Sequence, residues 1–152
     1  MELYIAAEGF TLPSGFVLKE LTIIFQNREY KHFMFKNPDN FYPTRKDLET
    51  IRYTTKHKNQ LSFTEGDVPY NLINDILAPY KDYKLYTYSG VFCSFLQKRL
   101  PTTTVLNIQS FGHYLPLKLP KPTCFRNHNP RYCSLAKALK ILKVVQDEVH
   151  LW

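Results

Sequence analysis

The chain has 152 residues, a length typical of one domain with a substantial core, and we predict a single domain over residues 1–152. Hydrophobic residues make up 44% of the chain and aromatic residues 15%, which excludes a disordered or collagen-like protein. The 20 lysines and arginines outnumber the 13 acids, and the net charge of +7 permits a polyanionic partner without requiring one.

The apolar runs and the cysteines predict an intracellular protein. No apolar run approaches the roughly 20 residues of a membrane-spanning helix, so no membrane partner is expected. The N-terminal stretch MELYIAAEGF lacks the basic segment and long apolar core of a secretory signal. Three cysteines, an odd number, argue against a disulfide framework. We therefore expect a reducing location, the cytoplasm or the nucleus or both, where Cys–His clusters tend to bind metal.

Three segments rich in β-branched and aromatic residues open the chain. They lie at 3–10, 16–25 and 29–36. Short turn-like connections at 12–15 and 26–28 join them. This pattern predicts an antiparallel meander of three strands.

Helices and strands alternate in the rest of the chain. The expected elements are a loop at 37–45, a helix at 45–58, a helix capped by Asp67 with Pro69 near its first turn, a strand at 84–89, a helix at 91–100, a strand at 103–109, a connection at 112–122 and a helix at 134–150. A meander followed by alternating strands and helices predicts an α/β domain, in which helices pack on a mixed sheet.

The last predicted helix is amphipathic. Its apolar face consists of Leu135, Ala138, Leu139, Leu142, Val145 and Val149. Three lysines, Lys137, Lys140 and Lys143, lie off that face. We expect the apolar face to pack on the sheet.

The stretch CFRNHNPRYC spaces Cys124, His128 and Cys133 as C-x3-H-x4-C. Zinc prefers four ligands in a tetrahedron and favours Cys thiolate and His imidazole. Cys133 would begin the last helix, whose dipole favours the thiolate that zinc requires. The alternative is that this stretch binds no metal and contains two unrelated half-buried cysteines and a surface histidine. Three ligands do not close a structural site, so a fourth ligand must come from elsewhere.

Several distant residues are candidates for that fourth ligand. His32, Cys93 and His113 carry suitable atoms, and so does the carboxylate of Glu20 in the segment VLKELTII. An acid between apolar neighbours needs a partner, unless it points to solvent from an alternating strand. Spacing alone does not decide between these ligands.

The first strand also carries an acid, Glu8 in IAAEGF. An early strand with a D-x-E pair opens the active site of DEDD-type exonucleases on the ribonuclease-H-like fold, where carboxylates hold two divalent ions. In this chain Ala6 stands at the first acid position, and none of the five histidines is followed by an Asp five residues later. Two-metal catalysis of that type is therefore not expected.

The segments AEGF, GFVLKEL and TEGDVPY, with the closing C…H…C before a helix, resemble the Maelstrom domain and related arthropod proteins. The resemblance implies a ribonuclease-H-like, exonuclease-derived fold with a five-stranded sheet in the order 3-2-1-4-5. It also implies one structural zinc per chain, bound by Glu20, Cys124, His128 and Cys133. Full Maelstrom proteins usually carry a preceding DNA-binding box, which this chain lacks, so a transposon-, virus- or arthropod-expanded branch stays open.

Three functions follow from these observations. The first is a catalytically degenerate nuclease fold that binds single-stranded RNA or a partner in piRNA-type silencing of transposons. Its candidate RNA contacts are Lys56, Lys58, Lys84, Lys98 and Arg99, each of which is otherwise a solvated surface residue. The second is a protein–protein interaction module of a transposon- or virus-related protein. The third is a weak, metal-independent single-strand ribonuclease that uses Glu8 with a base such as His113.

Overall fold

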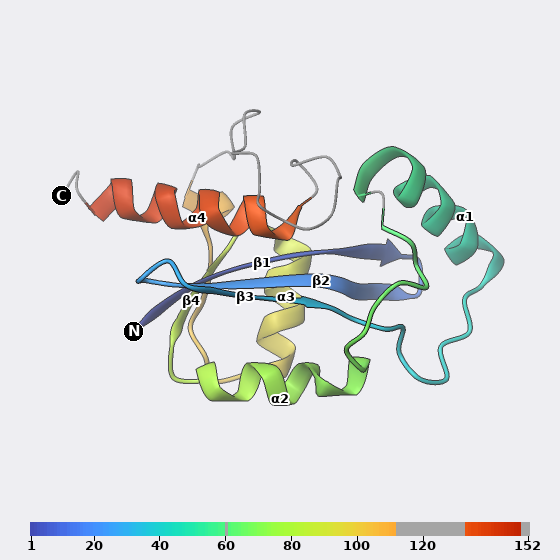
Figure 1. Cartoon of the computed structure of the whole chain (residues 1–152), viewed down its shortest axis with the longest axis horizontal. Coiled ribbons are helices and arrows are strands. Elements are labelled where there is room, and N and C mark those ends of the chain that lie inside the picture. The colour runs from blue at the N-terminus through green and yellow to red at the C-terminus, as the bar shows by residue number, and fades with distance from the viewer. Residues whose placement is uncertain (60, 112–132, 150–152) are drawn as a thin grey trace.

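Five strands form one mixed sheet in the order β3-β2-β1-β4-β5 (Figure 1). The computed structural model describes residues 1–59, 61–111 and 133–149. The strands are β1 (Glu2–Leu12), β2 (Gly15–Phe25), β3 (Tyr30–Met34), β4 (Lys84–Thr87) and β5 (Val105–Asn107). β1 pairs antiparallel with β2, and β2 with β3, whereas β4 is parallel to β1 and β5 to β4. The predicted meander and the strand order implied by the resemblance are both confirmed.

Helices cover both faces of the sheet (Figure 1). The helical elements are α1 (Arg45–Thr54) with the π-helical turn η1 (Thr55–Asn59), η2 (Tyr70–Leu72), α2 (Ile73–Leu77), η3 (Ala78–Tyr80), α3 (Gly90–Arg99), η4 (Ile108–Phe111) and α4 (Ser134–Val149). The predicted α/β class is confirmed. None of the helices in the described part of the chain is long and apolar enough to cross a membrane.

The prediction that Asp67 caps a helix is wrong. The backbone amides of Asp67 and Val68 both donate to the carbonyl oxygen of Met34, at 3.1 and 3.0 Å. This segment therefore extends the pairing beyond β3 instead of beginning a helix. The helical segment begins after Pro69, at Tyr70.

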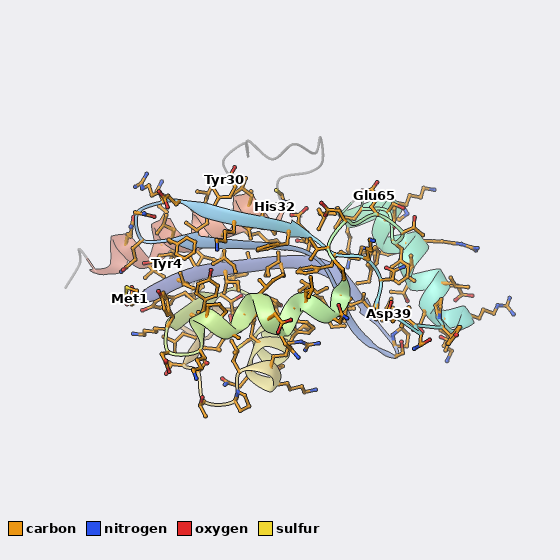
Figure 2. All side chains as sticks on the ribbon, turned by 60° about the horizontal axis from the view of Figure 1, so that its bottom comes forward. Met1, Tyr4, Tyr30, His32, Asp39 and Glu65 are labelled. Carbon is orange, nitrogen blue, oxygen red and sulfur yellow. The ribbon has the colours of Figure 1, made fainter. Side chains whose placement is uncertain are left out.

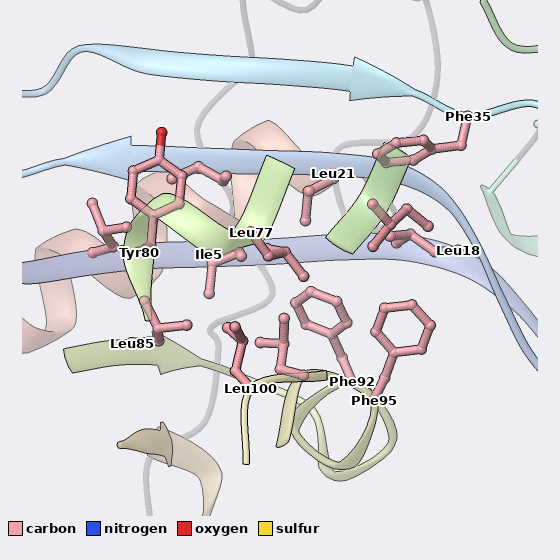
Figure 3. Packing of buried hydrophobic residues seen from close by; sticks show 14 residues of the cluster. Ile5, Leu18, Leu21, Phe35, Leu77, Tyr80, Leu85, Phe92, Phe95 and Leu100 are labelled. Atoms are coloured by element: carbon pink, nitrogen blue, oxygen red, sulfur yellow. The ribbon is translucent and has the colours of Figure 1, made fainter. Parts of the chain in front are cut away.

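Alternate residues of β1 face different hydrophobic layers. Leu3 and Ile5 belong to a core cluster with residues of α2 and α3, which Figure 3 shows from close by. Tyr4 and Ala6 belong to a second cluster with residues of α4. Because both faces of the sheet are covered, the central strands are apolar on both sides rather than on one.

A β-bulge interrupts the pairing of β1 with β2. Glu8 lies opposite Glu20, but the next pair joins Gly9 to Leu18, so Lys19 is an extra residue in β2. A Cβ atom at Gly9 would overlap the backbone of the neighbouring strand, so only glycine fits this approach. The bulge lets Leu18 face α2 and α3 while Glu20 turns toward α4.

Lys19 is fully buried, and its ammonium group is held by oxygen atoms. Its Nζ donates to the carbonyl oxygens of Phe35 at 2.7 Å, Phe63 at 2.9 Å and Glu65, and to Oδ1 of Asn37 at 3.2 Å. Hydrogen bonds from a charged donor stabilise more than neutral ones. Lys19 thus joins the middle of β2 to the end of β3 and to the loop that follows η1.

Helix α1 is fixed to the turn between β1 and β2. Thr44 and Asp47 form a capping box, in which the Thr44 hydroxyl accepts from the Asp47 amide at 3.1 Å and the Asp47 carboxylate from the Thr44 amide at 3.0 Å. The same carboxylate accepts from the hydroxyl of Ser14 at 2.9 Å. Hydrogen bonds, chiefly from the Thr44 backbone, hold the pKa of Asp47 below its usual value. Helix α1 therefore lies over the C-terminal end of β1.

We expect Lys19→Met to lower the free energy of unfolding by about 3 kcal/mol, because it leaves buried oxygen atoms without their shared donor. Urea unfolding followed by circular dichroism measures this change. The matched control is Lys31→Met on the exposed side of β3. Equal midpoints for the two variants would contradict the role assigned to Lys19.

Candidate functional site

Glu20 is completely buried where α4 begins. Its Oε1 accepts a hydrogen bond from the backbone amide of Ser134 at 2.6 Å and a second from the Ser134 hydroxyl. The same hydroxyl lies 2.8 Å from Oγ1 of Thr22, two residues along β2. The alternative in which Glu20 points to solvent is therefore wrong, because α4 covers this face of the sheet.

Cys133 precedes Ser134 and is also fully buried. The peptide group that joins these two residues is the one that donates to Glu20, so the carboxylate lies next to the backbone of Cys133. The structure thus brings together two of the four zinc ligands implied by the resemblance. The other two, Cys124 and His128, lie outside the described residues, as does His113.

A histidine, His32 on the edge strand β3 (Figure 2), lies close to Glu20. Its Nε2 lies 3.8 Å from Oε1 of Glu20. Burial raises the pKa of Glu20, but the His32 side chain and the Ser134 donors outweigh it, so the pKa lies below its usual value. Glu20 is therefore ionised at neutral pH, which is the form that binds a metal.

Cys93, another candidate ligand, is carried by α3, which packs on the opposite face of the sheet from α4. Cys93 therefore lies on the other side of the sheet from Glu20. Within residues 1–59, 61–111 and 133–149, no three His, Cys, Asp or Glu side chains gather into a group that could hold a metal ion. A complete site would need ligands from the stretch that includes Cys124 and His128.

Glu8 lies on the same face as Glu20, directly opposite it on the neighbouring strand. It is 8% exposed, and its carboxylate accepts a hydrogen bond from Nζ of Lys137. Burial raises the pKa of Glu8, which the Lys137 ammonium only partly offsets. The sequence pattern put Lys137 off the apolar face of the last helix but did not show that it reaches the sheet. It does so because the first turn of α4 crosses β1 beside Glu8.

A cavity of ≈ 290 Å³ lies beside this ion pair, between α1 and α4. We name it the polar pocket, and its lining residues are Glu8, Gly9, Thr11, Thr50, Tyr53, Thr54, Lys58 and Lys137. Its outer wall carries the exposed side chains of Tyr53 and Lys58, with the Lys58 Nζ 6.0 Å from the centre of the Tyr53 ring. The pocket therefore combines an ion pair, whose carboxylate is buried, with an exposed tyrosine and a second cation.

The five predicted RNA contacts lie on different parts of the fold. Lys56 and Lys58 lie together on η1. Lys84 begins β4 and lines another cavity, with its Nζ 5.4 Å from the Tyr86 ring centre. Lys98 and Arg99 end α3 and line a third cavity. Of the five, Lys58 is the one that the structure brings to the polar pocket.

Two pocket residues were missed by the sequence reasoning as binding candidates. Tyr53 lies in the helix predicted at 45–58 without a role of its own, and the structure leaves it 58% exposed. Lys137 was grouped with the other lysines of the last helix. Their nearness to Lys58 depends on how α1 and α4 meet over β1, and no local sequence pattern encodes that meeting.

No protein-family model matches the chain, and a comparison with curated proteins found no match. The resemblance to the Maelstrom domain therefore rests on the motifs of the sequence.

We expect Lys137→Met to lower the free energy of unfolding by about 3 kcal/mol, because the buried Glu8 carboxylate loses its ammonium partner. Lys143→Met, at an exposed position of the same helix, is the matched control. Adding Glu8→Gln to Lys137→Met should restore part of the loss, since no buried charge is then left uncompensated. Urea unfolding of the unmodified protein, Lys137→Met, Glu8→Gln, the double variant and the Lys143→Met control checks this, and strictly additive losses for Glu8→Gln and Lys137→Met would refute the coupling.

Proposed function

We propose that the chain is a nuclease-fold domain of the Maelstrom type that binds single-stranded RNA and acts in small-RNA silencing of transposons. The order of the five strands and the Ala6 residue at the first acid position of β1 both support a degenerate nuclease fold. Ala6 lies in the apolar layer under α4, where it supplies no metal ligand.

The observation that carries RNA binding is the polar pocket. Single-stranded RNA is bound mainly by stacking of bases on aromatic rings and by cations that contact the phosphates. Tyr53 offers an exposed ring, and Lys58 lies beside it. Lys56 on the same π-helical turn adds a further exposed cation. This arrangement suits an RNA strand that runs over the end of α1.

We further propose that Glu20, Cys124, His128 and Cys133 hold one structural zinc. The described half of this set fits the ion, because Glu20 is ionised, Cys133 is buried and the amide between Cys133 and Ser134 donates to Glu20. The metal would connect the middle of β2 to the start of α4. Four protein ligands leave no open position for a catalytic water, so its role is structural.

Metal analysis of the purified protein should find one zinc per chain. We expect Cys133→Ser and Glu20→Gln to reduce the zinc content, because each removes a ligand, whereas Cys93→Ser on α3 should retain it. A chelator should lower the midpoint of thermal unfolding of the zinc-bound protein. Zinc content near zero in the unmodified protein, or equal content in all three variants, would refute the metal proposal.

Binding of a labelled single-stranded RNA of about twelve nucleotides should weaken as salt is raised, because phosphate contacts release counterions. Lys58→Ala should weaken binding and reduce the log–log salt slope by about 0.7. Lys31→Ala on β3 should change neither quantity. Fluorescence anisotropy measures both.

The same samples separate the other two functions. The RNA should be recovered intact. Cleavage that Glu8→Gln abolishes would instead favour the ribonuclease, and the absence of any salt-dependent binding would favour a protein–protein interaction module.

A further inference from the structure

The polar pocket has a volume that suits one small chemical group, such as a single base. Its volume of ≈ 290 Å³ lies just below the range of ligand pockets, about 300–1,000 Å³. Its lining comes from three parts of the chain, β1, the end of α1 with η1, and the first turn of α4. Such a cavity suits a single base turned out of an RNA strand, with the backbone remaining at the surface.

The buried wall of the pocket carries an acceptor beside a donor. The Glu8 carboxylate has two oxygen atoms and several lone pairs, of which one oxygen takes the Lys137 hydrogen bond. The Lys137 ammonium has three N–H groups, so it can donate to Glu8 and to a ligand together. A ligand that matches this wall needs an acceptor opposite Lys137 and donors opposite Glu8.

Guanine is the RNA base that presents this pattern. Its Watson–Crick edge carries the O6 acceptor followed by two adjacent donors, the N1–H and the N2 amino group. The corresponding edge of uracil has a single donor between two acceptors. Adenine and cytosine each place a ring-nitrogen acceptor next to their amino group. Each of these three bases would turn an acceptor toward the Glu8 carboxylate.

Resting on the RNA binding proposed above, we infer that the polar pocket holds one guanine of a single-stranded RNA. Glu8 accepts from N1–H and the N2 amino group, and Lys137 donates to O6. The base enters past Tyr53, which is 58% exposed and offers its ring as a surface for stacking. Lys58 lies beside that ring, where it contacts the phosphate of the same nucleotide.

The charges of the pocket agree with this occupant. Two lysines and one glutamate line it, so the site remains cationic around a buried carboxylate. A phosphate is therefore attracted to the entrance even though the wall is acidic. A pocket with lysines alone would bind phosphate without reading the base, whereas Glu8 supplies the acceptors that distinguish guanine.

Anisotropy titrations with the full chain test this inference. The probes are labelled oligouridylates of about twelve nucleotides in which one central position is uridine, guanosine, inosine, adenosine or cytidine. We expect the guanosine probe to bind about tenfold more tightly than the uridine, adenosine and cytidine probes. Inosine, which lacks the N2 amino group, should fall between them.

Three variants assign the preference to the pocket. Glu8→Gln should bring the affinity for the guanosine probe down to that for the uridine probe, and Tyr53→Ala should weaken binding of the guanosine probe. Tyr42→Ala is the matched control, because Tyr42 is 82% exposed and does not line the pocket. Because the ring of Tyr53 is exposed, its removal tests the site even if the Glu8 variant fails to fold.

The outcomes separate this inference from the function on which it rests. Equal affinities for all five probes, or a preference for another base, would overturn the guanine site and leave RNA binding standing. A guanine preference that Glu8→Gln and Tyr53→Ala leave intact would also overturn it, because the base would then bind elsewhere. Binding of none of the probes at low salt would overturn the proposed function and this inference together.

Discussion

The fold depends on two adjacent charged residues, Lys19 and Glu20, that are both completely buried in β2. An isolated charge in a protein interior costs several kcal/mol, so each must be met by groups from other elements. Lys19 is met by oxygen atoms of the segments that follow β3 and η1. Glu20 is met by the amide and hydroxyl of Ser134 at the first residue of α4. Segments up to 114 residues away along the chain therefore contact the same point of β2.

Much of the fold was predictable because it repeats a local pattern. The three opening strands and the amphipathic last helix follow from hydrophobic periodicity, which depends only on near neighbours. The β-bulge does not, because β2 is apolar on both faces and alternation along it does not define a register. The predicted cap at Asp67 failed for a related reason. The sequence does not distinguish an aspartate whose amide pairs with the end of β3 from an aspartate that caps a helix.

The candidate site was predictable where one residue type demands a partner. An acid among apolar neighbours in β2 indicated that Glu20 needs a partner, and the structure supplies one at α4. The partners of Lys19 could not be predicted, because most of them are backbone carbonyls and every residue has one. The Glu8–Lys137 pair was equally hidden. It joins residues 129 positions apart, and only the path of α4 across β1 brings them together.

The proposed metal site and the polar pocket share the first turn of α4. Ser134 binds Glu20 and Lys137 binds Glu8, and residues three apart lie on the same side of a helix. Glu8 and Glu20 lie opposite one another on β1 and β2, so the two contacts lie side by side between the sheet and α4. A zinc ion that fixes the start of α4 would therefore also fix the position of the Lys137 ammonium in the pocket. A structural zinc at this position would therefore also affect ligand binding, because it would set the distance between the Lys137 ammonium and the Glu8 carboxylate in the polar pocket.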